Sequence, residues 1–194
     1  MPKKVIHDDV SLRYLSLRKL PEILRDLTII GKFNCSENYL LTLENSPLEV
    51  TGIYVCNYNT LKSLKGCTQS VGAFGCSETD ITTLEGGPQY VKDFYNVNEN
   101  KLISLKGAPK RVEGYFECGN NNLTSLIGAP EYVGGNFNCN YNKLTSLEGC
   151  PKYVGGDFFC RNNAVQFTTQ QIRAVCKIKG DIINKDLSHS PVVW

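Results

Sequence analysis

The strongest constraint on the fold is a unit of 21 residues that occurs twice in succession, from Gly114 to Gly134 and from Gly135 to Gly155. Both copies contain the pattern Phe-x-Cys-x-x-Asn-x-Leu-x-x-Leu. A fixed period of about 20 to 50 residues is typical of a solenoid, in which no unit folds alone and each is stabilised by stacking on its neighbours. We therefore expect the chain to form one continuous repeat domain.

Seven consecutive units share the same apolar positions. An aromatic residue is followed two positions later by a cysteine or valine, and this alternation predicts a short strand with both side chains directed inward. Two leucine or isoleucine positions three residues apart and a valine complete each unit. Their burial, at about 1.5–3 kcal/mol for each side chain, would supply the main stabilisation. The aromatic residues are Phe33, Tyr54, Phe74, Tyr95, Phe116, Phe137 and Phe158.

Three polar or conformationally special columns follow the strand. A buried asparagine, replaced once by Thr79, is expected to donate to carbonyls of the neighbouring turn and to accept from its own loop. A glycine column in which Asn45 stands once in place of glycine predicts a positive φ. Prolines then favour an extended or polyproline-like return segment. The asparagines are Asn38, Asn59, Asn100, Asn121, Asn142 and Asn163.

Nine cysteines raise the alternatives of disulfide bonds or a zinc site. Six of them share the inward position after the aromatic residue, where Val97 is the seventh member, so the position favours a small apolar side chain. Cys67 and Cys150 belong to a second column of small residues. The intervals follow the repeat period and lack the close Cys-x-x-Cys pairing of zinc sites. We favour buried free thiols over disulfides or a metal, and we expect no cofactor.

The period divides the chain into a repeat domain with an addition at each end. The N-terminal addition is expected to be a cap, either a short helix or a worn repeat in which Leu17 takes the position of Leu43. Its basic residues are interpreted as a solvated face rather than a binding patch. The expected segments are an N-terminal cap over 1–28, leucine-rich repeats over 29–163, a C-terminal cap over 164–183 and a flexible tail over 184–194.

The C-terminal cap is expected to contain a helix and then a strand. Thr168 and Gln171 can form a capping box at the start of the helix. The following segment, 177–183, alternates weakly and would add a strand that covers the open end of the sheet. In the tail, Pro191–Trp194 could instead anchor a partner. One face of the predicted helix holds Ile172, Val175 and Cys176.

Composition disfavours several classes of function. The formal net charge of +2 gives no bulk attraction to nucleic acid or to a membrane surface. No apolar run approaches the roughly 20 residues of a membrane span, and the N-terminus shows no secretory signal. His7 and His189 both lie outside the repeats, so a catalytic triad on the solenoid would lack its base. We expect a cytoplasmic protein that is not an enzyme, with no catalytic or metal-binding residues.

The surface left for function is the outward side of the strands. Structural need does not specify these positions, yet they hold aromatic and β-branched residues among asparagines, which is a composition suited to an adaptable protein-binding face. The alternative is that some of these aromatics only pack along the sheet. Tyr90, Tyr132 and Tyr153 are interpreted as covering the opposite edge. The candidate partner-binding residues are Ile53, Val55, Tyr58, Phe94, Tyr115, Tyr141 and Phe159.

The repeat Gly-x-Phe-x-Cys-x-x-Asn-x-Leu-x-Ser-Leu-x-Gly-x-Pro-x-x-Val, closing with the segment Phe167–Cys176, resembles the short leucine-rich-repeat proteins encoded by large tailed bacteriophages. The resemblance covers roughly residues 15 to 183. It implies a leucine-rich-repeat solenoid with short parallel strands, made in the cytoplasm of an infected bacterium. It also implies a protein that binds and blocks a host or defence protein, and it carries no catalytic or ligand residues.

Three functions are therefore weighed. The favoured one is a non-enzymatic protein-binding solenoid with a bacterial protein as its partner. The second is a nucleic-acid or nucleotide-binding module that stacks bases on exposed tyrosines, against which the sparse positive charge between those tyrosines counts. The third is a structural or oligomer-forming component held by its end caps. The oligomeric state is left open.

Overall fold

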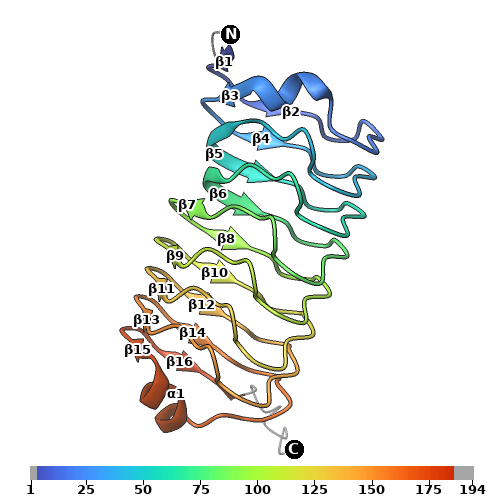
Figure 1. Ribbon diagram of the computed structural model, residues 1–194. Coiled ribbons are helices and arrows are strands. Elements are labelled where there is room, and N and C mark those ends of the chain that lie inside the picture. The colour runs from blue at the N-terminus through green and yellow to red at the C-terminus, as the bar shows by residue number, and fades with distance from the viewer. Residues whose placement is uncertain (1–3, 186–194) are drawn as a thin grey trace, which may run out of the picture.

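The computed structural model describes residues 4–185, which form a parallel β-solenoid of about nine turns (Figure 1). Successive turns lie in parallel register, so that Phe116 pairs with Tyr95 on one side and with Phe137 on the other. Each of these partners is 21 residues away along the chain. One repeat of the sequence therefore forms one turn of the solenoid. The predicted β-solenoid is confirmed.

Most turns contribute two short strands, which form two ladders along the molecule (Figure 1). The valine ladder contains β1 (Lys4–Ile6), β3 (Leu27–Ile29), β7 (Tyr90–Val91), β9 (Arg111–Val112), β11 (Tyr132–Val133), β13 (Tyr153–Val154) and β15 (Lys177–Ile178). The aromatic ladder contains β2 (Val10–Ser11), β4 (Phe33–Asn34), β8 (Tyr95–Asn96), β10 (Phe116–Glu117), β12 (Phe137–Asn138), β14 (Phe158–Phe159) and β16 (Ile182–Ile183).

Two longer strands, β5 (Glu49–Val55) and β6 (Ser70–Gly75), run through both ladders and join them into one 16-stranded sheet within the described residues. Val71 lies three residues before Phe74, whereas Val50 lies four residues before Tyr54. The pairing of β5 with β6 therefore shifts between Val50 and Ile53. The repeat predicted one short strand in each turn, at the aromatic position, so the valine ladder is a second set of strands that was not predicted.

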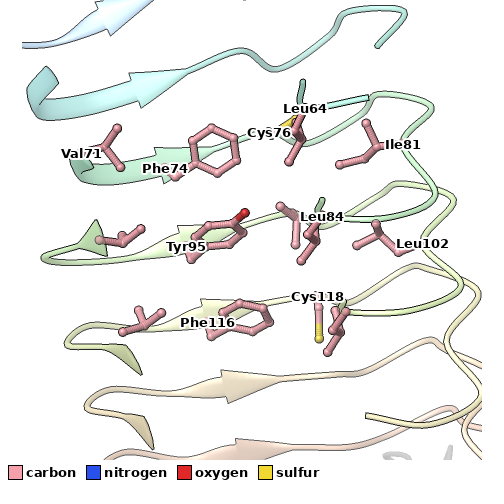
Figure 2. Close-up of a cluster of buried hydrophobic side chains, with 14 of the residues drawn as sticks. Leu64, Val71, Phe74, Cys76, Ile81, Leu84, Tyr95, Leu102, Phe116 and Cys118 are labelled. Atoms are coloured by element: carbon pink, nitrogen blue, oxygen red, sulfur yellow. The ribbon is translucent and has the colours of Figure 1, made fainter. Parts of the chain in front are cut away.

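The core lies between the strands and the leucine positions. Figure 2 shows Phe74, Tyr95 and Phe116 one above another, with Val71 on one side and leucines on the other. The ring centroids of Phe74 and Tyr95 are 5.0 Å apart, and those of Tyr95 and Phe116 are 5.4 Å apart. All seven aromatic residues of this column are fully buried. The inward positions predicted from the repeat are therefore confirmed, although Leu147 is only half-buried.

The nine cysteines are free thiols, of which eight are buried and Cys150 is half-buried. Burial raises the pKa of Cys35 to about 12 and also raises the pKa of Cys118. A thiol is nucleophilic only as the thiolate, so these side chains act as apolar filling for the core.

The asparagine column links neighbouring turns as predicted, except for the group from which the side-chain oxygen accepts a hydrogen bond. Asn121 Nδ2 donates to Val97 O of the preceding turn at 3.0 Å, and also to Cys118 O and Gly119 O of its own turn. Its Oδ1 accepts from Leu102 N, at 2.9 Å, on the preceding turn. The side-chain oxygen thus accepts from the neighbouring turn and not from its own loop, because the amide of Leu102 on that turn has no partner in a strand.

The glycine column has the backbone conformation that its composition predicted. The five glycines have φ between 80° and 94°, and Asn45 has φ 68° in the same position. A Cβ added at Gly128 would lie 2.6 Å from the carbonyl carbon of Leu105, so the adjacent turn also leaves no room for a side chain.

The N-terminal segment is a small part of the sheet with one 3-10 helix, η1 (Glu22–Asp26). Strand β1 pairs with β3, and β2 pairs with β4, so the alternative of a worn repeat describes this segment better than a helical cap. Tyr39 N donates to Leu17 O at 2.8 Å, which aligns Leu17 with Leu40. The expected alignment of Leu17 with Leu43 is wrong, because η1 adds residues after Leu20 that the other turns lack.

The C-terminal segment contains the predicted helix, α1 (Thr169–Val175), whose N-cap Thr168 forms the predicted capping box with Gln171. Ile172 is fully buried, but Val175 is 48% exposed and does not share its face. The chain then forms β15 and β16, which add one more rung to each ladder in place of a single covering strand. The predicted flexible tail beyond residue 185, and with it the alternative anchor Pro191–Trp194, lies outside the described residues.

Candidate protein-binding face

The outward side of the aromatic ladder, which we call the strand face, carries side chains in rows. Because the turns are in register, residues of one row lie on adjacent turns, about 4.8 Å apart. The row before the buried aromatic residue contains Lys32, Ile53, Ala73, Phe94, Tyr115, Asn136 and Asp157. The row after it contains Asn34, Val55, Gly75, Asn96, Glu117, Asn138 and Phe159.

Four of the seven predicted partner-binding residues lie together on this face as an apolar patch: Ile53, Val55, Phe94 and Tyr115. Phe94 and Tyr115 stack with ring centroids 4.8 Å apart and planes within 1° of parallel. Ile53 pairs in register with Ala73, which is only 2% exposed although it points outward. The patch is therefore an apolar surface on two strands, β5 and β6, and on the segments just before β8 and β10.

The other three predicted residues lie apart from this centre or at its margin. Tyr58 and Tyr141 are 50% and 56% exposed and lie four residues after the buried aromatic, in a row along the edge of the face. Four turns separate them, which corresponds to about 19 Å. Phe159 pairs in register with Ile183 at the C-terminal end of the ladder. Only Tyr58 therefore lies near the apolar patch, and the structure does not bring all seven residues into one site.

The edge row has a common backbone conformation that sequence analysis missed. Its members all have positive φ, between 52° and 56°, although none is glycine. Glutamate and tyrosine are uncommon in this conformation, so residue type gave no signal beyond the asparagines at two positions. The members are Glu37, Tyr58, Glu78, Glu99, Asn120, Tyr141 and Asn162.

The edge row carries carboxylates on neighbouring turns. Glu78 and Glu99 are on adjacent turns, and neither has an ion pair within residues 4–185. A hydrogen bond to Glu78 raises the pKa of the Tyr58 hydroxyl. A hydrogen bond from Tyr14 and a weaker effect from Arg13 both lower the pKa of the Glu37 carboxyl. Three of the seven residues of this row are glutamates, and Arg13 already pairs with Glu37.

The asparagines of the face are already engaged. Asn98 Oδ1 accepts from Gly119 N at 2.6 Å, and Asn140 Oδ1 accepts from Arg161 N. The Glu117 carboxylate accepts from Asn98 Nδ2 at 3.0 Å and from Asn138 Nδ2 at 2.8 Å. These amides hold adjacent turns in register, so they give the face rigidity rather than the adaptable hydrogen bonding expected from composition.

A metal site and a membrane-spanning helix are not found in the part of the chain that the structure describes. Within it, no three His, Cys, Asp or Glu side chains are grouped so that they could hold a metal ion. None of its helices has the length and apolar character needed to cross a bilayer. Comparison with protein-family models, with curated proteins and with solved structures finds no match to this chain. Its function is therefore argued from the geometry of its surface.

Proposed function

We propose that this chain is a non-enzymatic protein-binding solenoid whose strand face holds a protein with basic residues around an apolar contact. The observation that carries the proposal is the position of the apolar patch beside the acidic edge row. The patch offers stacked aromatic rings on a rigid sheet, which lose little conformational entropy on binding. Glu78 and Glu99 lie at its margin and supply electrostatic complementarity to lysine or arginine.

The patch has the arrangement of an interface centre and rim. Phe94 and Tyr115 lie on a floor of paired strands and hydrogen-bonded amides, so their positions are fixed before a partner arrives. Aromatic residues held in this way are common among residues that dominate binding energy. The charges of Glu78 and Glu99 would act mainly on the rate of association, since they lie at the edge and stay hydrated.

The finer identity rests on the sequence resemblance alone. We propose that the solenoid is of the leucine-rich-repeat type, that it acts in the cytoplasm of a phage-infected bacterium, and that it inhibits a host or defence protein. The repeat motif supports this assignment. The uncompensated carboxylates support a basic partner surface, and they count against nucleic acid on this same face, because phosphate would be repelled.

A pull-down from bacterial lysate with two matched variants tests the proposal. Phe94→Ala/Tyr115→Ala removes a stacked pair from the strand face, while Tyr132→Ala/Tyr153→Ala removes a stacked pair of similar geometry from the valine ladder. We expect the first variant alone to lose the captured protein, with a drop in affinity of at least about tenfold. Glu78→Gln/Glu99→Gln should slow association and weaken its dependence on salt.

Purified partner and titration calorimetry then give the affinities. Equal capture by the native chain and by the Phe94→Ala/Tyr115→Ala variant would remove the strand face as the site. So would a captured protein whose affinity rises when Glu78 and Glu99 are neutralised. Melting curves of both double variants separate loss of binding from loss of folding.

A further inference from the structure

The valine ladder carries a second outward row, which we call the tyrosine–cation ridge. Arg111 lies with its Cζ 3.7 Å from the ring centroid of Tyr132. The rings of Tyr132 and Tyr153 stack at 4.9 Å and within 4° of parallel, and Lys179 Nζ lies 5.8 Å from the Tyr153 centroid. The sequence-based interpretation that the tyrosines cover an edge is therefore incomplete, because Arg111 and Lys179 flank the stacked pair of Tyr132 and Tyr153.

An open groove of about 720 Å³ lies at one end of this ridge, and Tyr90 and Arg111 are among the residues that line it. Tyr90 is 72% exposed, and its ring has no aromatic or cationic partner among residues 4–185. Arg111 packs one side on Tyr132, and its other side lines the groove. Two planar groups thus border a space of the size that small ligands occupy. The remaining lining residues are Ser70, Gln89, Val91, Lys92, Lys110 and Glu113.

The charge of the ridge is positive after its internal pairs are counted. Glu113 accepts from Arg111 Nη2 at 3.0 Å, and Glu131 lies between Lys152 and Lys110. Both of these carboxylates are already engaged by cations of the ridge. The cations are Lys92, Lys110, Arg111, Lys152, Lys177 and Lys179. Their excess over the carboxylates gives the ridge a local positive field that the chain's formal net charge of +2 does not reveal.

We propose that the ridge binds single-stranded nucleic acid, with one base in the groove stacked on the exposed ring of Tyr90 and phosphates along the lysines. Aromatic rings interleaved with cations along one line are the features by which proteins hold single strands without reading their sequence. An acidic peptide would use the lysines but would leave the two planar faces of the groove without a partner. The site is separate from the strand face, so it does not depend on the proposed protein-binding function.

Fluorescence anisotropy with the full chain and a labelled oligothymidine of about 12 nucleotides tests the proposal. With about three phosphate contacts, log K should fall with log salt at a slope of about −2. Tyr90→Ala should weaken binding about 5- to 150-fold, because stacking of one base is lost. Lys92→Gln/Lys110→Gln should weaken binding and reduce the magnitude of the slope by about 1.4.

The matched control is Lys65→Gln/Lys106→Gln, which removes the same charge from side chains 75% and 76% exposed on the return segments. It should leave oligothymidine binding nearly unchanged. Three results would overturn the proposal: no binding at about 50 mM salt, equal losses in the two lysine variants, or polyglutamate competing as well as oligothymidine with no effect of Tyr90→Ala. The last would assign the ridge to acidic peptides.

Discussion

Two tyrosines in the buried aromatic column show how a single hydroxyl is accommodated in a repeated core. Tyr54 Oη lies 2.7 Å from Ser46 Oγ, so this hydroxyl is hydrogen-bonded. The hydroxyl of Tyr95 is buried and has no hydrogen-bond partner within the described residues. Eight residues earlier, in the position of Ser46, stands Gly87, where an added Cβ would lie 2.9 Å from that hydroxyl. The glycine makes room for the oxygen but does not satisfy it.

We therefore expect Tyr95→Phe to raise the free energy of unfolding by about 1 kcal/mol, because an unsatisfied buried hydroxyl is removed. Tyr95→Phe with Gly87→Ala copies Ala108 and Phe116 of the next turn and should be at least as stable, whereas Gly87→Ala alone should be destabilising. The control is Tyr54→Phe, which should lower stability by about 0.5–1.5 kcal/mol. Urea unfolding measures all four variants, and a loss of stability in Tyr95→Phe would show that its hydroxyl has a partner.

At the scale of elements, a carboxylate on the return segments ties three successive turns together. Asp80 Oδ2 lies 2.6 Å from Lys62 Nζ, and Asp80 Oδ1 lies 2.6 Å from Lys101 Nζ. Hydrogen bonds from Lys101 and then Lys62 lower the pKa of Asp80 to about 2. A carboxyl whose pKa is lower in the folded state stabilises above its unfolded pKa, and this contribution disappears as the pH falls through the folded value.

Asp80→Asn should therefore be less stable than the native chain near about pH 6, and the difference should shrink between about pH 4 and pH 2. Added salt should reduce the difference at the higher pH, because these side chains are solvent-exposed. Asp26→Asn is the control, since Asp26 only lies 3.9 Å from its neighbour Arg25. Unfolding curves over this pH range make the measurement. A difference that stays constant with pH would rule out the two ion pairs as its source.

The sequence predicted those elements whose residues repeat, and it missed those defined by contacts between turns. Phe116 and Asn121 were assigned correctly because the same side chain recurs wherever the packing needs it. Arg111 and Tyr132 differ in type along their row, so only the register of the valine ladder shows that they stack. The candidate site was likewise half predicted: the apolar patch follows from its outward positions, but Tyr141 is about 19 Å from Tyr58 because four turns separate them.

At the scale of the whole molecule, the stacking of turns brings residues that are distant in sequence side by side. It also places negative charge on one ladder and positive charge on the other. The strand face gathers Glu78, Glu99 and Glu117, while the ridge gathers lysines and Arg111. The formal net charge of +2 is therefore an average over two surfaces of opposite sign. Bulk charge disfavours nucleic acid for the whole chain, but it says nothing about one face of a solenoid.

The two faces should act independently, although one turn contributes to both. Arg111 on the ridge and Tyr115 in the patch are four residues apart, at most about 14 Å along extended chain. Coupling would require a shared element with two arrangements, and the core residues Val112 and Phe116, which directly follow Arg111 and Tyr115, are fully buried and regularly stacked. Phe94→Ala/Tyr115→Ala should therefore leave oligothymidine affinity within about twofold of the native value.

Leu102→Ala is the control for an indirect effect through loss of folding. It leaves a cavity in the core beneath both faces, which should cost about 2–5 kcal/mol of stability. Anisotropy titrations compare the variants at a temperature where each remains folded. A tenfold loss of oligothymidine binding in the patch variant, with its melting temperature unchanged, would mean that the strand face and the ridge belong to one site. An unchanged affinity, together with loss of the protein partner, would show that the protein and the nucleic acid use separate surfaces.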